Sequence, residues 1–520
     1  MKWSLVLLSL LLVACTREVA TPPLIRAQSS GCELTGWIMQ QKPHSTRTLE
    51  APPSVLRDTV ITVNGTEHKI SIPEGFTMSV FAQIPSCRGL ALSSDGVIYA
   101  TSFNGKIYAL PDHDHNGTPD SVIIVATGLG QPHGIGFIDK MLYASSDQGA
   151  LYHLITPATS RVSTDRSVVS PLPPHGDHFT RNFVFDSIHQ KIYLQIGSDG
   201  NMDTTTNFVH LAQIVEMNPD GSGYRTFARG LRNAVGLDLD PRTDALWANN
   251  NGMDDIFGSG TELTANNPSE SIYIICDGAN YGWPFCYGFR MRNPVYPWST
   301  LDTNIVQTFS GPVAEVLAHE APLGLHFYRG STFPALYHNA IFQCYHGSWD
   351  RSPPAPPRIT VMWADTDGKN ARVTDFVNGF QPDSTDNRWG RVVSIIEGGD
   401  SALYVSDDQA GVIYRIAWTG PPQQQAVNST QNSVTFSLGI PSPNPATNAV
   451  AFTIDVAQPA SISVYLLDLL GRQLRSIPTQ IAGVGTTTFH LPTDGLPNGT
   501  YVLRASSNGQ VASRRVVIER

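Results

Sequence analysis

Charged residues are scarce in this chain of 520 residues. Asp, Glu, Lys and Arg together make up 15% of the sequence, and the formal net charge is −10. Lys and Arg form no basic stripe, which argues against nucleic acid as a partner. A chain of this composition must gather its few Arg side chains locally if it is to bind an anionic ligand.

Long apolar runs are missing after the N-terminus, so no later segment is predicted to span a membrane. The opening MKWSLVLLSLLLVACTRE is too short for a span and is typical of a secretory signal peptide. We predict a signal peptide over 1–20, export through the periplasm, and a secreted or cell-surface location. The LVAC stretch resembles a bacterial lipobox, in which Cys15 would carry a lipid. The alternative is a cysteine that is discarded with the signal.

Cysteine is sparse, with six in the chain, and the absence of a CxxCH motif excludes a covalently attached c-type haem. Export to an oxidising compartment favours disulfides. Cys276 and Cys286 flank a short loop that a bridge would close, and a bond between Cys32 and Cys87 would tie the N-terminal arm to the first repeat. Cys344 lies in an apolar run and is predicted to be a buried free thiol.

Turn-forming residues, by contrast, are abundant, with 44 Gly and 37 Pro, which favours many short strands over long helices. One unit recurs, in which alternating apolar residues, a turn and a Tyr- or Trp-containing strand follow one another. Its copies begin at Gly89, Gly134, Asn182, Gly236, Gly324 and Val392. Six units of about four strands each predict an all-β fold with a six-bladed β-propeller over 73–418. An array of β-sandwiches is the alternative, but long polar insertions between the repeats favour the propeller.

The flanking segments differ from the repeats. An N-terminal arm over 21–72 contains RDTVITVNGTEHKISI, which predicts a hairpin with an Asn-Gly turn. Residues 419–436 form a Pro- and Gln-rich linker, and 437–520 alternate like the strands of a small Ig-like β-sandwich.

This tail contains PSPNP, VYLLDLLGRQL and LPNGTYVLR, three spaced stretches that resemble the C-terminal sorting domain of the type IX secretion system. The resemblance implies that the tail is an export address and that the type IX machinery is a partner. A generic Ig-like adhesion module is the alternative.

Ordered motifs between about Pro73 and Trp418 resemble the glucose/sorbosone dehydrogenase family, whose members are sugar dehydrogenases dependent on pyrroloquinoline quinone (PQQ). The motifs include HFTRNFVF, KIYLQIGSDGN, GLRNAVGLDLDP, NNNGMDD, NYGWPFCYG, HEAPLGLHFY, HGSWDRS and WGRVVSI. The sorbosone-type branch is nearer than the soluble glucose dehydrogenases. The resemblance implies a six-bladed propeller, PQQ and calcium as cofactors, and an aldose, sorbosone or related sugar as substrate. Electrons would pass to an external acceptor.

The resemblance also implies a general base. His178, in PHGDHFTRN, matches the catalytic histidine of the family. An imidazole with an ordinary pKa near 6.5 suits the removal of a sugar hydroxyl proton while hydride leaves for the quinone. Asp177 would orient the ring or contact sugar hydroxyls, and His175 is a weaker candidate. A loop histidine with satisfied hydrogen bonds is the alternative.

Quinone and calcium contacts are implied for two further pairs. Arg232 and Asn233 match the pair that grips the quinone, because paired donors suit planar carboxylate and carbonyl oxygens; an ion pair at a blade edge is the alternative. Gly252 and Met253 match the backbone carbonyls that hold calcium.

Basic residues late in the chain complete the expected quinone site. Arg391 and Arg388 match residues of the last blade in the family. The glucose-specific branch has a lysine where this chain has HGSWDRS, so His346 or Arg351 is expected to replace it.

A second calcium candidate is the stretch PDHDHNGTPD. Positions 1, 3, 5, 7 and 9 of a calcium loop would be Asp112, Asp114, Asn116, the Thr118 carbonyl and Asp120. Gly117 stands at the turn, but position 12 is Ile123 and lacks the usual carboxylate. An Asx-rich turn between strands is the alternative.

Four aromatic residues, Tyr281, Trp283, Phe285 and Tyr287, are candidates for the wall of a sugar site, and packing between strands is the alternative. For the whole domain, the runner-up function is a non-catalytic propeller that binds glycans or a protein partner. A metal-dependent lactonase or hydrolase is a third reading. It would place carboxylates and Asn at the central channel, where the motifs place His and Arg instead.

Overall fold

The structure is a computed structural model. It describes residues 56–154, 166–173, 176–202, 211–296, 306–420, 436–439, 441–456, 460–467, 473–507 and 510–519. The chain forms two compact units, Met1–Pro422 and Gln423–Arg520. The expected signal peptide with Cys15, as well as Cys32, His175 and most of the linker, lies outside the described residues.

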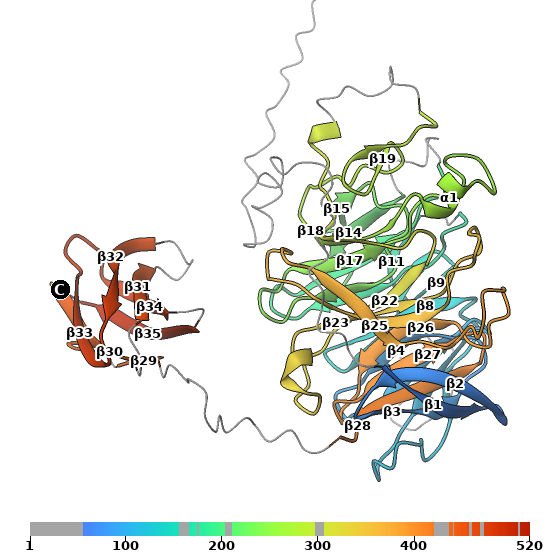
Figure 1. The fold of residues 1–520 in the computed structure, drawn as a ribbon, viewed down its shortest axis with the longest axis horizontal. Coiled ribbons are helices and arrows are strands. Elements are labelled where there is room, and N and C mark those ends of the chain that lie inside the picture. The colour runs from blue at the N-terminus through green and yellow to red at the C-terminus, as the bar shows by residue number, and fades with distance from the viewer. Residues whose placement is uncertain are drawn as a thin grey trace, which may run out of the picture. The chain divides into compact units, whose positions relative to one another are not determined.

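The described residues of the first unit form six four-stranded antiparallel sheets, and Figure 1 shows how their strands are arranged. Sheet 1 holds β4 (Cys87–Leu92), β5 (Ile98–Ser102), β6 (Lys106–Leu110) and β7 (Ile123–Ala126), and sheet 2 holds β8 (Pro132–Ile138), β9 (Met141–Ser146), β10 (Ala150–Leu154) and β11 (Arg166–Pro171). Sheet 3 holds β12 (Phe183–Asp186), β13 (Lys191–Ile196), β14 (Gln213–Met217) and β15 (Arg225–Arg229), and sheet 4 holds β16 (Leu237–Leu239), β17 (Leu246–Asn250), β18 (Glu270–Ile275) and β21 (Ala314–Val316). Sheet 5 holds β22 (Pro322–Phe327), β23 (Ile341–Tyr345), β24 (Arg358–Trp363) and β25 (Arg372–Val377), and sheet 6 holds β26 (Val392–Glu397), β27 (Leu403–Asp407), β28 (Val412–Trp418) and β3 (Phe76–Gln83).

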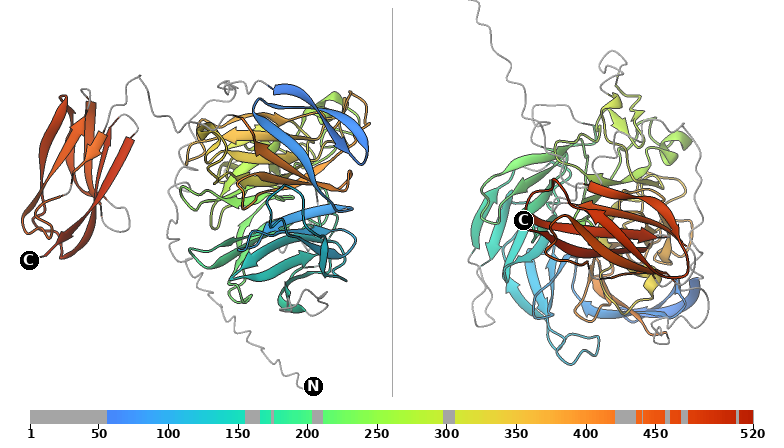
Figure 2. Two further views of the ribbon diagram at one scale, coloured as in Figure 1. Left: turned by 90° about the horizontal axis from the view of Figure 1, so that it is seen from below. Right: turned by 90° about the vertical axis from the view of Figure 1, so that its left-hand side faces the viewer.

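The first strands of these sheets, β4, β8, β12, β16, β22 and β26, surround a common axis. They line one cavity of about 160 Å³, to which all six contribute. Strands radiating from a shared channel are the arrangement of a β-propeller. Further views of the same strands are given in Figure 2.

A repeated contact joins neighbouring sheets near the axis. A polar side chain of one sheet donates a hydrogen bond to a backbone carbonyl at the start of the next sheet. The pairs are Thr101 with His133, Ser145 with Arg181, Asn182 with Val235, Asn249 with Leu323, and Ser406 with Arg88. Sheets 5 and 6 meet instead at Gly324, where a Cβ atom would lie 2.7 Å from the Val393 carbonyl oxygen. The recurring glycine of the sequence repeat is therefore required by close packing between sheets.

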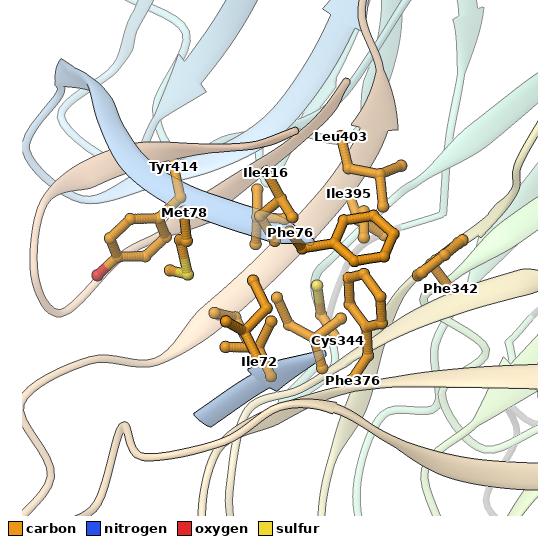
Figure 3. Packing of buried hydrophobic residues seen from close by; sticks show 14 of the residues in the cluster. Ile72, Phe76, Met78, Phe342, Cys344, Phe376, Ile395, Leu403, Tyr414 and Ile416 are labelled. Carbon is orange, nitrogen blue, oxygen red and sulfur yellow. The ribbon is translucent and has the colours of Figure 1, made fainter. Parts of the chain in front are cut away.

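Sheet 6 is completed by a strand from the other end of the unit. β3 pairs antiparallel with β28, with Phe76 opposite Trp418 and Gln83 opposite Val412, and the two strands lie side by side in Figure 1. Phe76 fills the interior beside Phe342, Phe376 and Ile416 (Figure 3). The strand that precedes the first sheet in the sequence thereby completes the last sheet and closes the ring.

Smaller elements surround the sheets. The expected Asn-Gly hairpin is present as β1 (Leu56–Val63) and β2 (Thr66–Pro73), and its His68 ring stacks on Trp389 at a centroid distance of 4.1 Å. Insertions carry the helix α1 (Glu262–Asn266), the 3₁₀ turn η5 (Ala335–Tyr337), and the two-residue strands β19 (Cys286–Tyr287) and β20 (Met291–Arg292). No helix in the described part of the chain is long and apolar enough to cross a membrane.

The described residues of the second unit form two sheets around their own core. One sheet holds β29 (Phe436–Leu438), β30 (Ala449–Val456) and β33 (Gly485–Pro492), and the other holds β32 (Gln473–Ala482), β31 (Ala460–Leu467), β34 (Gly499–Ser507) and β35 (Gln510–Ile518). Alternate residues such as Val450, Phe452 and Ile454 are buried, as the period of two in the sequence predicts. These side chains join residues of both sheets in one apolar cluster.

Both expected disulfides are wrong. Cys87, Cys286 and Cys344 are free and buried, whereas Cys276 is disulfide-bonded. Cys286 lies near Cys276 in the sequence but does not pair with it. Its side chain packs instead in an apolar cluster with Val306 and Phe309. Burial raises the pKa of the Cys286 thiol to about 11. The prediction of a buried free thiol at Cys344 is confirmed.

The calcium-loop candidate connects β6 to β7. Asp112 accepts hydrogen bonds from the backbone N–H groups of Asn116 and Gly117, at 3.1 and 3.0 Å. Asn116 Oδ1 accepts from the Thr118 N–H at 2.9 Å, and Gly117 has a φ of 83°. The side-chain oxygens of Asp112 and Asn116 thus bond to the backbone of their own loop, an arrangement shared by Asx turns and by calcium loops. Calcium binding here stays a prediction.

We expect Phe76→Ala to lower the free energy of unfolding by about 3–5 kcal/mol, because it leaves a cavity among well-packed rings. Chemical denaturation of the purified protein measures the change. Phe289→Ala is the control, since Phe289 is 52% exposed, and a shift of no more than about 0.5 kcal/mol is expected there. Equal effects of the two changes would contradict a structural role for β3 in closing the ring.

Calcium is expected to raise the melting temperature, since binding to the folded state alone adds about 2.7 kcal/mol at a hundred times Kd. Asp112→Ala should remove the share of this shift that arises at the loop. Asp367→Ala is the matched control, because Asp367 also accepts a backbone hydrogen bond in an exposed turn. Identical melting curves in calcium and in chelator would refute the prediction.

Candidate functional site

The segment before β12 is tightly anchored. Arg181 is 1% exposed, and its Nη1 donates to the carbonyls of His178 and Thr180, both at 2.9 Å. A Cβ atom on Gly197 would lie 2.5 Å from the His178 Cβ, so a glycine is needed where β13 ends. The two hydrogen bonds from Arg181 therefore fix the backbone at His178.

The His178 ring is oriented by Ser198. Its Nδ1 lies 2.9 Å from the Ser198 hydroxyl oxygen and 3.2 Å from the Ser198 carbonyl. Since that hydroxyl donates to the Gly200 carbonyl at 2.7 Å, Nδ1 carries the proton and donates to Ser198. This tautomer leaves Nε2 as a proton acceptor. Asp177, expected as an alternative orienting group, makes no hydrogen bond to the ring.

The electrostatic surroundings keep His178 neutral. Burial, followed by the positive charge of Arg232, lowers the pKa of His178 to about 3. The ordinary value near 6.5 that suited the base on sequence grounds is therefore not the value in this structure. The imidazole stays in its basic form throughout the neutral pH range.

A cavity of about 490 Å³ brings the expected residues together, within the usual size of ligand sites. Its lining residues are Asp177, His178, Asn201, Arg232, Asn233, Asn251, Gly252, Asp254, Asp255, Glu270, His319, Ala321 and Trp349. Five of them were expected from the sequence, namely Asp177, His178, Arg232, Asn233 and Gly252. They come from segments that precede β12 and β16 and follow β17, and only the ring of sheets makes them neighbours.

Arg232 is 6% exposed and has one free donor group. Its Nη2 contacts Asp254 at 2.7 Å and Asn201 Oδ1 at 3.1 Å, and its Nε donates to the Asn201 carbonyl at 3.3 Å. Its Nη1 makes no hydrogen bond to any residue that the structure describes, nor does the Nδ2 amide of Asn233. Both are thus available as donors to a ligand in the cavity.

Oxygen atoms for a cation gather beside these donors. The carbonyls of Gly252 and Met253 accept no hydrogen bond from the described residues, which leaves them free for a metal. Next to them, ligand atoms of Asp254, His319 and Asp350 lie within 4.8 Å of one another. This group is the one set of three or more His, Cys, Asp or Glu ligands found in the described part of the chain.

Buried charges around this group compensate one another. His319 Nε2 donates to the Thr264 carbonyl at 2.7 Å, and its Nδ1 lies 3.5 Å from Asp254. Burial lowers the pKa of His319, but these two partners outweigh burial and raise it above its usual value. The pKa of Glu270 is also raised, in this case by burial itself, which disfavours the carboxylate. Glu270 accepts a hydrogen bond from the Gly252 N–H.

The other expected basic residues lie around Asp408, outside the lining of this cavity. Asp408 accepts from Arg88 at 2.6 Å and from His346 Nε2 at 3.0 Å, and Arg391 Nε donates to the His346 carbonyl at 3.0 Å. Burial, together with the nearby guanidinium groups of Arg388 and Arg88, lowers the pKa of Arg391 to about 10, although Asp408 opposes this effect. An anionic ligand would raise the pKa of the basic groups in this cluster, because a negative neighbour favours their charged forms.

Short contacts connect the Asp408 cluster to the cavity. The His346 N–H donates to the carbonyl of Ala321, which lines the cavity, at 3.0 Å. The Arg88 guanidinium lies 4.6 Å from the centre of the Phe103 ring, and Phe103 packs on Phe179, the neighbour of His178, at a centroid distance of 5.8 Å.

The side chains of Arg351 and Arg388 donate hydrogen bonds to backbone carbonyls instead. Arg351 donates to the Ala265 carbonyl of α1, and Arg388 donates to the Ser348 carbonyl at 2.8 Å. Neither side chain lines the cavity, so both hold the segment between β23 and β24 against its neighbours.

The four aromatic candidates do not line the 490 Å³ cavity. Tyr281 and Trp283 are 3% and 5% exposed, the Tyr281 hydroxyl donates to the Ile274 carbonyl at 2.7 Å, and Trp283 Nε1 donates to the Asn201 carbonyl at 3.1 Å. The packing alternative therefore describes them better. The aromatic residue at the cavity is Trp349, which sequence reasoning missed although it lies within the quoted HGSWDRS.

Sequence reasoning also missed Asn201, Asn251, Asp254, Asp255, Glu270 and His319. Asp254 and Asp255 directly follow Gly252 and Met253 in NNNGMDD, so their position along the chain was a usable signal. Nothing local indicated Glu270, whose role depends on its contact with the Gly252 backbone.

Curated relatives match more than half of the chain. A protein of Borreliella burgdorferi is 28% identical over 67% of this chain and 90% of its own length. A pyrroloquinoline quinone-dependent pyranose dehydrogenase of Coprinopsis cinerea is 26% identical over 57% of this chain, which spans 45% of that enzyme. A pyrroloquinoline quinone-dependent sugar dehydrogenase of Hypocrea jecorina is 22% identical over 51% of this chain and 69% of its own length.

Solved structures agree on the fold. An AA12-family carbohydrate-active enzyme of Trichoderma reesei, in a calcium structure, matches 72% of this chain and 99% of its own with a TM-score of 0.59 at 18% identity. The holo pyranose dehydrogenase PQQ domain of Coprinopsis cinerea matches 69% of this chain and 100% of its own with a TM-score of 0.57 at 21% identity.

Family comparisons cover both units. Residues 442–519 match the secretion system C-terminal sorting domain, which confirms the resemblance seen in the tail. Residues 70–419, more than half of the sequence, match the TrAA12-like family, and the chain belongs to that family.

Proposed function

We propose that this chain is an exported oxidoreductase that oxidises an aldose or related sugar with PQQ as hydride acceptor, and passes the electrons to an external acceptor. Support comes from the PQQ-dependent sugar and pyranose dehydrogenases among its relatives. The sorting domain over 442–519 supports export through the type IX machinery to a secreted or cell-surface location. We propose further that the six sheets are the six blades of one propeller and that the second unit is an Ig-like module.

One observation carries the proposal. His178, Arg232, Asn233 and Gly252 were expected to share a site and all line one cavity. Three of them present polar atoms that no described residue satisfies, namely His178 Nε2, Arg232 Nη1 and Asn233 Nδ2. An acceptor beside two donors suits a sugar hydroxyl next to a planar polar ligand.

The donor set fits a flat quinone with several carboxylates. Arg232 Nη1 and Asn233 Nδ2 would hold its oxygens from one side, and the carbonyls of Gly252 and Met253 would hold the accompanying calcium. Arg391 and Arg88 add positive charge in the adjacent Asp408 cluster, whereas burial lowers the pKa of His346 to about 4 and keeps its imidazole neutral. When bound, PQQ supplies a quinone carbonyl carbon that accepts a hydride.

His178 would perform the proton step. Its Nε2 accepts the proton of the sugar hydroxyl, and the resulting imidazolium is held through the Nδ1 contact with Ser198. Asp177 is exposed at the cavity edge, and its carboxylate would accept hydrogen bonds from other hydroxyl groups of the sugar.

Mutations can distinguish the role of His178 as a base from the role of Arg232 in binding PQQ. His178→Ala should lower kcat by about 10²–10⁴-fold, as when a positioned base is removed, while PQQ affinity changes little. Arg232→Ala should weaken PQQ binding first, because it removes a charge-assisted donor. Dye reduction with a sugar panel and PQQ titration followed by absorbance measure the two effects.

A distant arginine provides the control for this experiment. Arg242→Ala is the control, because Arg242 pairs with Asp240 at 2.7 Å and does not line the cavity. If His178→Ala protein loaded with PQQ reduced dye as fast as the wild type, the base assignment would fail. Glycan binding without any turnover in the wild type would favour the non-catalytic alternative.

The pKa of His178 gives a test that needs no turnover. In unloaded protein its imidazole should stay neutral well below pH 6.5, because burial and Arg232 disfavour the charged form. Arg232→Gln should raise the pKa toward its ordinary value, and PQQ carboxylates bound beside Arg232 should also raise it. NMR titration of labelled histidine measures these shifts, and a wild-type midpoint near 6.5 that Arg232→Gln leaves unchanged would contradict the site geometry.

A further inference from the structure

Trp349 is the aromatic side chain that lines the 490 Å³ cavity, and it is 72% exposed. Its indole makes no hydrogen bond and no ring contact with any residue that the structure describes. An isolated exposed apolar side chain is ordinary on a protein surface. What distinguishes Trp349 is that its large flat surface borders a cavity whose other lining residues are mainly polar.

The backbone beneath Trp349 is held firmly although its ring is free. Ser348 is 1% exposed, its N–H donates to the Ala355 carbonyl at 3.0 Å, and its hydroxyl accepts from the Ala355 N–H at 2.7 Å. On the other side, Asp350 accepts from the Asp255 N–H at 3.3 Å, and Arg351 is bonded to the end of α1. A ring on a rigid support offers contact area at a small cost in conformational entropy.

Exposure divides the cavity into a floor and a mouth. Arg232, Glu270 and His319 are between 3% and 6% exposed and form the floor, whereas Asp177 and Trp349 are exposed. The reacting sugar carbon must lie inside, next to His178 Nε2, and the ring of Trp349 borders the way out. A hydrogen-bond acceptor is available there, since the Asp177 carboxylate is exposed and accepts no hydrogen bond from the described residues.

We propose that Trp349 forms an outer subsite that stacks on a second pyranose ring, so that the preferred substrates are oligosaccharides oxidised at their terminal sugar. The inference rests on the proposed function for the identity of the inner site. A pyranose presents axial C–H groups on its face and hydroxyl groups on its edge. The indole face covers the first, and the Asp177 carboxylate accepts hydrogen bonds from the second. An open-chain aldehyde has no such face.

Kinetics with sugars of different length test the subsite. In PQQ-loaded protein, Trp349→Ala should raise KM for cellobiose and maltose about tenfold, the effect of losing an aromatic contact, and leave kcat and the KM for glucose unchanged. Trp349→Phe should retain most of the disaccharide preference. Phe289→Ala is the matched control, because Phe289 is an exposed ring of the same unit that does not line the cavity.

The outcomes separate this inference from the proposed function. Equal rises in KM for glucose and cellobiose would overturn the outer subsite, because Trp349 would then contact the reacting ring. Unchanged KM values for all sugars would overturn it as well. If wild-type protein oxidised no sugar, the proposed function would fail. Titration of unloaded protein with cellotetraose, followed by calorimetry, would then decide the subsite: binding that Trp349→Ala abolishes supports it, and no binding or undiminished binding overturns it.

Discussion

The fold depends on a buried hydrogen bond that recurs from sheet to sheet. Thr101, Ser145, Asn249 and Ser406 are fully buried and each reaches a carbonyl at the start of the next sheet. An unsatisfied carbonyl at such a depth costs about 1–3 kcal/mol, so a sheet that presents one needs its neighbour. The bond from Ser406 to Arg88 returns from sheet 6 to sheet 1, and β3 completes sheet 6 by pairing with β28.

Closure of the ring also assembles the site. The segments before β12 and β16 and the segment after β17 meet at one cavity because the first strands all surround the same axis. Asp408, which follows β27, binds Arg88 of β4 across 320 positions of sequence. This pair joins the last sheet to the first beside the expected basic groups. Loops on a rigid ring place reactive groups accurately while leaving their sequence free to vary.

Within the cavity, one charge serves two purposes. Arg232 offers Nη1 to a ligand and at the same time holds His178 in its neutral form, since a positive neighbour disfavours the imidazolium. Asp254 pairs with Arg232 and also with His319, so the buried charges form a balanced network. An anionic ligand would change this balance and would make His178 a stronger base when the ligand is in place.

Strand repeats, turn residues, the sorting domain and the motifs around His178, Arg232, Asn233 and Gly252 could all be predicted from the sequence. Period-two patterns and glycine positions can be read locally from the sequence. Gly324, for example, belongs to the repeat pattern because a larger residue there would collide with the next sheet. Tertiary structure alone decided which groups became partners. It left Cys286 free, buried Tyr281 and Trp283, oriented His178 on Ser198 and left Trp349 exposed at the cavity. The physical reason is that these contacts depend on distances between sheets, which exist only once the ring has closed.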